Sequence, residues 1–266
     1  DLLLKLADGK VDYVVTDSIH ISVAKNFYSN LGVAMSLGKE NTKAWALSLR
    51  EEPELQKKIE KFFKRIEEDG TLNRLIDRYY GHIQRLGQEN VNKFLEKTNT
   101  FLPTIRNYFY QAEEITKIDW RLIAALSYQE SHWDRKATSF TNVRGIMMLT
   151  KATAERMKVT DRLNARQSIL AGARYLLILK NTLPSRIVEP DRTWIALAAY
   201  NQGYGHIEDA RILAQRMNLS PDLWVDLKKS LPLLSHRRHF ENLKYGYARG
   251  GEAVYLTESV RAYYDI

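Results

Sequence analysis

Beyond Gly87, hydrophobic and polar residues repeat with a helical period through almost the whole chain. Apolar side chains recur every three or four positions, which places them on one face of an amphipathic helix. Gly, Asn and Pro separate the periodic stretches. We predict helices over Phe101–Ile118, Trp120–Ser131, Thr150–Met157, Ala165–Leu179, Thr193–Tyr200 and Ile207–Met217. The pattern therefore predicts a mainly α protein.

The part of the chain before Gly81 mixes two periods, in the style of an α/β segment. Helical periodicity predicts helices over Leu2–Leu6, Glu54–Glu68 and Leu72–Tyr80. Short apolar runs predict strands over Val11–Asp17, Leu31–Met35 and Ala44–Leu49. This change of character divides the chain into two predicted domains, residues 1–85 and residues 86–266.

The overall charge of the chain points to an acidic partner. The 266 residues are 44% hydrophobic, enough to form a core, and carry a formal net charge of +8. Anionic lipid and the carboxylate-rich bacterial wall suit that charge. Nucleic acid is disfavoured, because no basic stripe is interleaved with exposed aromatic residues. The absence of cysteine excludes disulfides and thiolate metal sites.

The sequence contains no segment that resembles a membrane span, because no apolar run approaches the roughly 20 residues required. Its first residues, Asp1-Leu2-Leu3-Leu4, include no initiator Met and have the pattern of a helix interior. We therefore expect the natural start to lie upstream, and the lack of a signal peptide says nothing about the compartment.

Glu130 is a carboxylate on an apolar helix face. It lies one helical turn after Leu126 and two turns after Ile123, so the three side chains share a face. Burial of a carboxylate raises its pKa, which suits a general acid near neutral pH. Periodicity alone favours the simpler alternative, a Glu at a helix end that reaches water, and only the motifs around Glu130 reverse this preference.

Three short motifs follow one another in this region. They are Glu130-Ser131, then Gly145-Ile146-Met147-Met148-Leu149, and finally Ala199-Tyr200-Asn201-Gln202-Gly203. With them, residues 95–266 resemble the lytic transglycosylase domain of the soluble lytic transglycosylase type. The resemblance implies a lysozyme-like helical fold that acts on the glycan strands of peptidoglycan. One position departs from the family pattern, because Met148 stands where the family has Gln.

The resemblance implies that Glu130 acts alone. It would protonate the glycosidic oxygen between N-acetylmuramic acid and N-acetylglucosamine, then accept the proton of the muramic C6 hydroxyl as that oxygen attacks C1. The product is a 1,6-anhydro sugar, so the enzyme would be a lyase. No second carboxylate lies in a motif, although glycosidases commonly use two. A hydrolytic muramidase and a non-catalytic glycan-binding module remain the alternatives.

Further residues are candidates for binding the substrate or orienting the acid. They are Ser131, Met147, Met148, Tyr200, Asn201, Tyr255 and Tyr263. Tyr200 and Asn201 are favoured by their motif, whereas packing or capping is an open alternative for the others. Neither His132 nor His206 has metal-ligand spacing, so we predict no metal and no cofactor.

The first segment resembles part of another family. Gly9–Asp17, Asp69–Leu72 and Tyr79–Gly81 are similar to the C-terminal part of family 3 extracellular solute-binding proteins. This resemblance implies a partial regulatory domain whose intact form would bind a muropeptide or an amino acid. Together the two resemblances imply the periplasm and peripheral association with the cell outer membrane.

Overall fold

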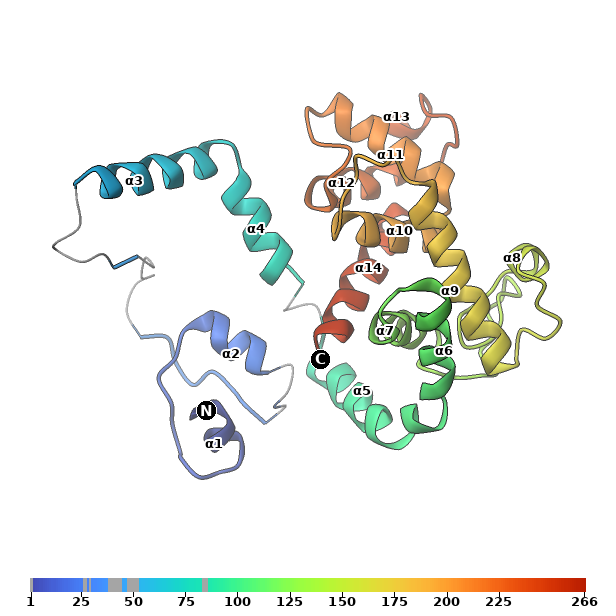
Figure 1. Cartoon of the computed structure of the whole chain (residues 1–266), viewed down its shortest axis with the longest axis horizontal. Helices are drawn as coiled ribbons and strands as arrows, with labels where there is room; N and C mark the ends of the chain where they lie inside the picture. Colours follow the sequence, from blue (N-terminus) through green and yellow to red (C-terminus); the bar gives the residue numbers. More distant parts are fainter. Residues whose placement is uncertain (1, 26–27, 29, 38–44, 47–52, 83–85) are drawn as a thin grey trace. The chain divides into compact units, whose positions relative to one another are not determined.

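The structure of the protein is a computed structural model that describes residues 2–25, 28, 30–37, 45–46, 53–82 and 86–266 (Figure 1). The chain forms two compact units, residues 1–84 and residues 85–266. The mainly helical prediction is confirmed, because helices occupy most of the described residues.

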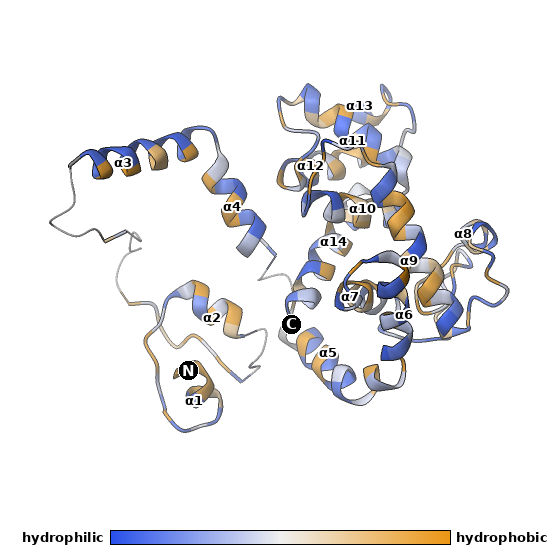
Figure 2. Cartoon of the chain, in the orientation of Figure 1, coloured by the Kyte–Doolittle hydropathy of each residue, from blue (hydrophilic) through white to orange (hydrophobic). Residues whose placement is uncertain are grey.

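The first unit contains four described helices. They are α1 (Leu2–Ala7), α2 (Ser18–Ala24), α3 (Pro53–Glu68) and α4 (Thr71–Tyr80). The three helices predicted for this segment are confirmed, whereas α2 was not predicted. α3 packs against α4, and both carry one orange, hydrophobic stripe beside blue, polar positions (Figure 2). Several apolar side chains of this unit are nevertheless exposed, among them Phe62 and Tyr79.

The strands predicted over Val11–Asp17 and Leu31–Met35 are wrong, because both segments are extended or irregular without strand pairing. The backbone groups of a strand must pair with a neighbouring strand. The described residues of this unit contain no strand with which these segments could pair. Tyr13 and Val15 lie exposed in the first segment. The strand predicted over residues 44–49 lies mostly outside the described residues.

The second unit is built from helices. They are α5 (Gln88–Thr100), η1 (Leu102–Thr104), α6 (Arg106–Thr116), α7 (Trp120–Ser131), α8 (Lys151–Arg156), α9 (Ala165–Thr182), α10 (Asp191–Gln202), α11 (Tyr204–Arg216), α12 (Trp224–Ser230), η2 (Leu231–Ser235), α13 (Arg237–Phe240) and α14 (Gly250–Asp265). All six helices predicted here are confirmed, and α7 has the predicted bounds.

Two kinds of difference separate prediction from structure in the second unit. The helix predicted from Phe101 begins only at Arg106, because Pro103 lies in a separate 3-10 turn and disfavours helical backbone before it. The helices α5, α12, α13 and α14 were not predicted. In α14, two glycines at the start weaken the helical signal, and Gly250 is required because a Cβ there would lie 1.9 Å from the Leu231 carbonyl oxygen.

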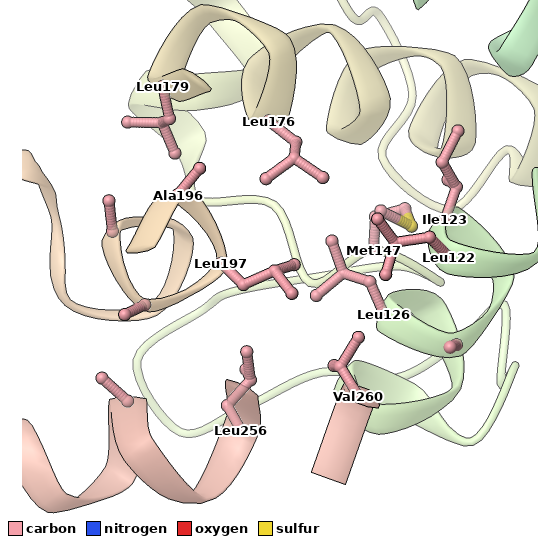
Figure 3. Packing of buried hydrophobic residues seen from close by; sticks show 14 of the residues in the cluster. Leu122, Ile123, Leu126, Met147, Leu176, Leu179, Ala196, Leu197, Leu256 and Val260 are labelled. Atoms are coloured by element: carbon pink, nitrogen blue, oxygen red, sulfur yellow. The ribbon is translucent and has the colours of Figure 1, made fainter. Parts of the chain in front are cut away.

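α7 runs through the middle of the core. It packs against α6, α9 and α14, and α10 packs against both α9 and α14. Figure 3 shows Leu126 of α7 facing Leu197 of α10 and Val260 of α14. These three side chains are fully buried. Because α7 is enclosed from several sides, its last turn, which carries Glu130, is held in place by the core.

A buried ion pair fixes α14. The Glu258 carboxylate accepts hydrogen bonds from the indole of Trp224 and from the guanidinium of Arg261, and Lys228 lies 3.6 Å away. Burial acts to raise the pKa of Glu258, but the charges of Arg261 and Lys228 outweigh it and the pKa is lowered. The carboxylate therefore stays ionised and ties α14 to α12.

Among the described residues, none of the helices combines the length and the hydrophobicity that a membrane span requires.

Candidate active site

Glu130 occupies the last turn of α7, and its side chain is partly buried. Burial raises the pKa of its carboxyl group to about 8. Burial is the sole cause of that shift, so no neighbouring carboxylate contributes to it. A group with this pKa is protonated at neutral pH and can donate its proton to a substrate.

The chain turns sharply after Glu130. His132 ends α7 in the left-handed conformation, with φ 51°, and Trp133 follows with φ 60°. The Lys97 ammonium donates a 2.7 Å hydrogen bond to the His132 carbonyl oxygen. The buried Trp133 indole donates a 3.0 Å hydrogen bond back to the Ala124 carbonyl oxygen in α7. These contacts fix the end of the helix and with it the position of Glu130.

The second motif forms a tight loop that meets α7. Arg144 and Leu149 pair as an antiparallel bridge at its base. At its tip the Ile146 carbonyl oxygen accepts hydrogen bonds from the hydroxyls of Ser131, at 2.8 Å, and Ser127, at 3.0 Å. Ser131 therefore anchors the loop beside Glu130, which leaves its hydroxyl engaged with the backbone.

Glycine is required at the first position of this loop. Gly145 has φ 82°, and a Cβ on it would lie 1.9 Å from the Arg162 carbonyl oxygen. Met147 follows and is fully buried against Gly172 of α9. Met147 thus packs in the core, the alternative that the sequence left open for one of the two methionines, because α9 approaches closely at Gly172. Met148 has φ 44° and stays partly exposed.

Tyr200 links the third motif to the same loop. Its hydroxyl donates a 2.9 Å hydrogen bond to the Met147 carbonyl oxygen. Burial raises the pKa of Tyr200 well above its usual value, and the charge of Glu130 adds to the rise. Tyr200 therefore lies within electrostatic reach of the acid. Its ring centroid lies 5.5 Å from that of Tyr175.

The other candidates lie in different environments. Asn201 is exposed at the end of α10, where its side-chain oxygen accepts a 2.9 Å hydrogen bond from Gln202. Tyr255 is 51% exposed on α14. Tyr263 is buried, with its ring centroid 4.9 Å from that of Tyr128. Tyr263 thus has the packing role that the sequence left open for it, because this core of aromatic rings encloses it.

Two serines of this site were missed by the sequence reasoning. Ser127 binds the Ile146 carbonyl oxygen, and the buried Ser168 of α9 accepts a 3.3 Å hydrogen bond from the Met147 backbone N–H. Ser127 lies one turn before Ser131, so its place on the same helix face was an available signal. Ser168 offered no comparable signal, because only the packing of α9 brings it to the loop. No group of residues that could hold a metal is found in the described parts of the chain.

Comparison with known families assigns this region. Residues 107–220 match the family model described as "Transglycosylase SLT domain". This stretch of the chain is therefore similar to a transglycosylase SLT domain. The matched residues include Glu130, the loop at Gly145 and Tyr200, and their mainly helical fold agrees with the prediction.

The chain outside this stretch also has relatives. All 266 residues align with proteins named "Membrane-bound lytic murein transglycosylase F", at 66% identity in Nitrosospira multiformis, 55% in Methylobacillus flagellatus and 50% in Thiobacillus denitrificans. The chain spans 56% of the length of the first two relatives and 57% of the third. The resemblance therefore extends beyond this stretch over the first unit as well.

Proposed function

We propose that this protein is a peptidoglycan lytic transglycosylase that cleaves the bond between N-acetylmuramic acid and N-acetylglucosamine. The observation that carries the proposal is Glu130, a partly buried carboxyl group whose pKa burial raises to about 8. It lies in the stretch that is similar to an SLT domain, and the relatives that align with the whole chain are named lytic murein transglycosylases.

The reaction needs one group that is first an acid and then a base. Protonated Glu130 donates its proton to the glycosidic oxygen as the bond to C1 breaks. The resulting carboxylate accepts the proton of the muramic C6 hydroxyl, whose oxygen forms the new bond to C1. One bond at C1 breaks and one forms, and Glu130 regains its proton, so no water is consumed. The product carries a 1,6-anhydro ring. A carboxyl group with a pKa near the working pH suits both halves of this cycle.

The residues around Glu130 support this role by holding the acid in place. Ser131 and Tyr200 both bind backbone carbonyls of the same loop, at Ile146 and Met147. The acid, its neighbour and the third motif are thereby joined through a single loop. Met148, Asn201 and Tyr255 are at least partly exposed, and we assign them to substrate binding.

The test is digestion of purified peptidoglycan by the protein and by Glu130→Gln, with the released fragments weighed by mass spectrometry. We expect fragments one water lighter than hydrolysed ones, and a loss of roughly 10²–10⁴-fold in rate for Glu130→Gln. The amide keeps the size of the side chain but cannot supply the proton.

Other outcomes of this digestion identify the alternatives. Fragments with a free reducing end would make the protein a hydrolytic muramidase. Binding of glycan without any fragments, from either form, would indicate a non-catalytic glycan-binding module. Undiminished activity of Glu130→Gln would contradict the assignment of the acid.

We further propose that the protein works in the periplasm at the cell outer membrane, in keeping with the relatives' name "membrane-bound". Residues 1–85 are proposed to belong to a solute-binding-like domain that regulates cleavage in response to a muropeptide or an amino acid. The test is cleavage by a protein of the relatives' full length, with and without added muropeptide. A muropeptide that binds without changing the rate would contradict this regulation.

A further inference from the structure

A pocket lies beside the base of the loop that carries Gly145. It encloses about 330 Å³ and is lined by residues of the loop base, of α8 and of the segment before α9. This volume falls within the range of small-ligand sites. The lining residues are Arg144, Lys151, Ala154, Glu155, Val159, Thr160, Asp161, Arg162 and Leu163. None of the residues proposed above for acid chemistry or sugar binding lies in it.

The charge of this pocket is predominantly positive. Its lining has three cations, Arg144, Lys151 and Arg162, against two carboxylates, Glu155 and Asp161. Lys151 and Glu155 form an ion pair at 3.8 Å, so they largely compensate each other. Arg162 donates hydrogen bonds to the backbone carbonyl oxygens of Asn142 and Leu149, which carry no formal charge. The remaining two arginines and one aspartate favour an anion.

The wall of the pocket is preorganised by internal hydrogen bonds. The Gln167 side-chain oxygen accepts from the backbone N–H and the hydroxyl of Thr160, both at 3.0 Å. The Asp161 carboxylate accepts from the Leu163 backbone N–H at 2.9 Å. Arg162 is held by carbonyl oxygens of Asn142 at 2.7 Å and Leu149 at 3.0 Å. A ligand therefore meets a formed site, with little ordering to be done on binding.

The pocket and the active site share one structural wall. Arg144 pairs with Leu149 at the base of the loop whose tip binds Ser131 and Tyr200. Arg162 also contacts this loop, since its carbonyl oxygen lies against Gly145. The pocket is predominantly positive, so it offers an adjacent site to a negatively charged group that extends from a glycan bound near Glu130.

We propose that this pocket binds a carboxylate of the stem peptide that the muramic acid residues of peptidoglycan carry. Arg144 and Arg162 pair with the carboxylate, and Asp161 accepts an ammonium group of the same peptide. The inference rests on the proposed function, because it assigns the pocket a part of the same substrate. It makes the protein selective for strands that still bear peptides.

The first experiment compares two substrates. Cleavage is measured on glycan strands that carry stem peptides and on strands freed of them by an amidase. We expect a higher kcat/KM on peptide-bearing strands, and Arg144→Gln should reduce the ratio of the two values roughly tenfold, because it removes a charge-assisted contact. Arg156→Gln is the matched control, since Arg156 is exposed on α8 but does not line the pocket, and it should leave the ratio as it is.

The second experiment does not depend on cleavage. Free stem peptide is titrated into the Glu130→Gln chain by calorimetry, alone and combined with Arg144→Gln or Asp161→Asn. Arg144→Gln should weaken binding of a peptide whose amino group is blocked, whereas Asp161→Asn should strengthen it by removing the repelling charge. Opposite signs from two changes in one pocket cannot come from a general loss of folding.

The outcomes separate the pocket from the catalytic proposal. Equal kcat/KM on both substrates, together with no binding of the free peptide, would overturn the pocket inference while leaving the transglycosylase proposal intact. Peptide binding that depends on Arg144, in a chain that cleaves neither substrate, would support the pocket and contradict the proposed activity.

Discussion

The hydroxyl of Tyr200 donates a 2.9 Å hydrogen bond to the carbonyl oxygen of Met147, although the two residues are 53 positions apart in the chain. This bond joins α10 to the loop that also accepts the hydroxyl of Ser131. The charge of Glu130 raises the pKa of Tyr200 further than burial does by itself. We therefore propose that Tyr200 positions the acid through the loop.

The rate of cleavage should fall at alkaline pH. The first step needs protonated Glu130, and burial raises the pKa of this group to about 8. We expect kcat/KM to decrease above pH 8, tenfold for each further pH unit. The measurement is a pH profile on isolated glycan strands. A descending limb near pH 4.5, the ordinary value for Glu, would contradict the assignment of Glu130 as the acid.

The stability of the fold should depend on pH through the same residue. The pKa of Glu130 is raised in the folded chain, so the folded state binds its proton more tightly than the unfolded state does. Below pH 4.5 both states are protonated and Glu130 contributes nothing to this dependence. As pH rises from 4.5 to about 8 the free energy of unfolding decreases, by a total on the order of a few kcal/mol.

Glu130→Gln should remove this pH dependence. Near pH 4, the free energy of unfolding should change with pH in the same way in the variant and the parent. Above pH 8, the variant should be the more stable of the two. Urea unfolding at a series of pH values measures both free energies. A difference between the two chains that is the same at every pH would show that Glu130 is not desolvated in the folded state.

Tyr200→Phe should loosen the active-site loop. The change leaves the Met147 carbonyl oxygen without its hydroxyl donor while keeping the ring. We expect a loss of about 1–2 kcal/mol in stability and a decrease in kcat with little change in KM, because the acid rather than the substrate is displaced. Tyr175→Phe is the matched control, since its ring packs on Tyr200. An equal decrease in kcat for both variants would count against the role of the Met147 contact.

Gly145→Ala should disrupt the loop altogether. The new Cβ would lie 1.9 Å from the Arg162 carbonyl oxygen and would hold a residue at φ 82°. We expect a destabilisation on the order of 3 kcal/mol or more, with loss of cleavage. Gly246→Ala is the control, because Gly246 also has positive φ, at 76°, but has no atom within 4 Å of its Cβ position.

The Gly246→Ala variant separates backbone strain from steric contact in the destabilisation expected for Gly145→Ala. Gly246→Ala should cost only about 1 kcal/mol, the conformational strain alone. The difference between the two thermal unfolding free energies measures the close approach of the loop to Arg162. Equal losses would mean that backbone strain, and not this contact, makes glycine necessary at position 145.

Much of the second unit could be predicted because its helices are amphipathic. The face of α7 that carries Leu126 is apolar in the sequence and buried in the structure. The same periodicity placed Glu130 on that face, and so indicated a raised pKa. The strand prediction over Val11–Asp17 failed because an apolar run specifies a strand only where a partner strand offers hydrogen bonds.

The roles of the individual candidates could not be predicted in the same way. Met147 and Met148 are adjacent and identical in type, yet one is buried against Gly172 and the other is partly exposed. Tyr255 and Tyr263 lie on one helix, yet only Tyr263 enters the aromatic core. In each pair the difference comes from the neighbouring helix, which sequence periodicity does not identify.

The sequence by itself determined the helical class, the bounds of α7 and the carboxylate on its apolar face, because these depend on contacts between residues one or two turns apart. Only the tertiary structure decided what surrounds that carboxylate. Ser131, Ser168 and Tyr200 come from three helices and meet at one loop through hydrogen bonds to its backbone. Backbone atoms are the same at every residue, so such contacts leave no specific pattern in the sequence and are set by packing alone.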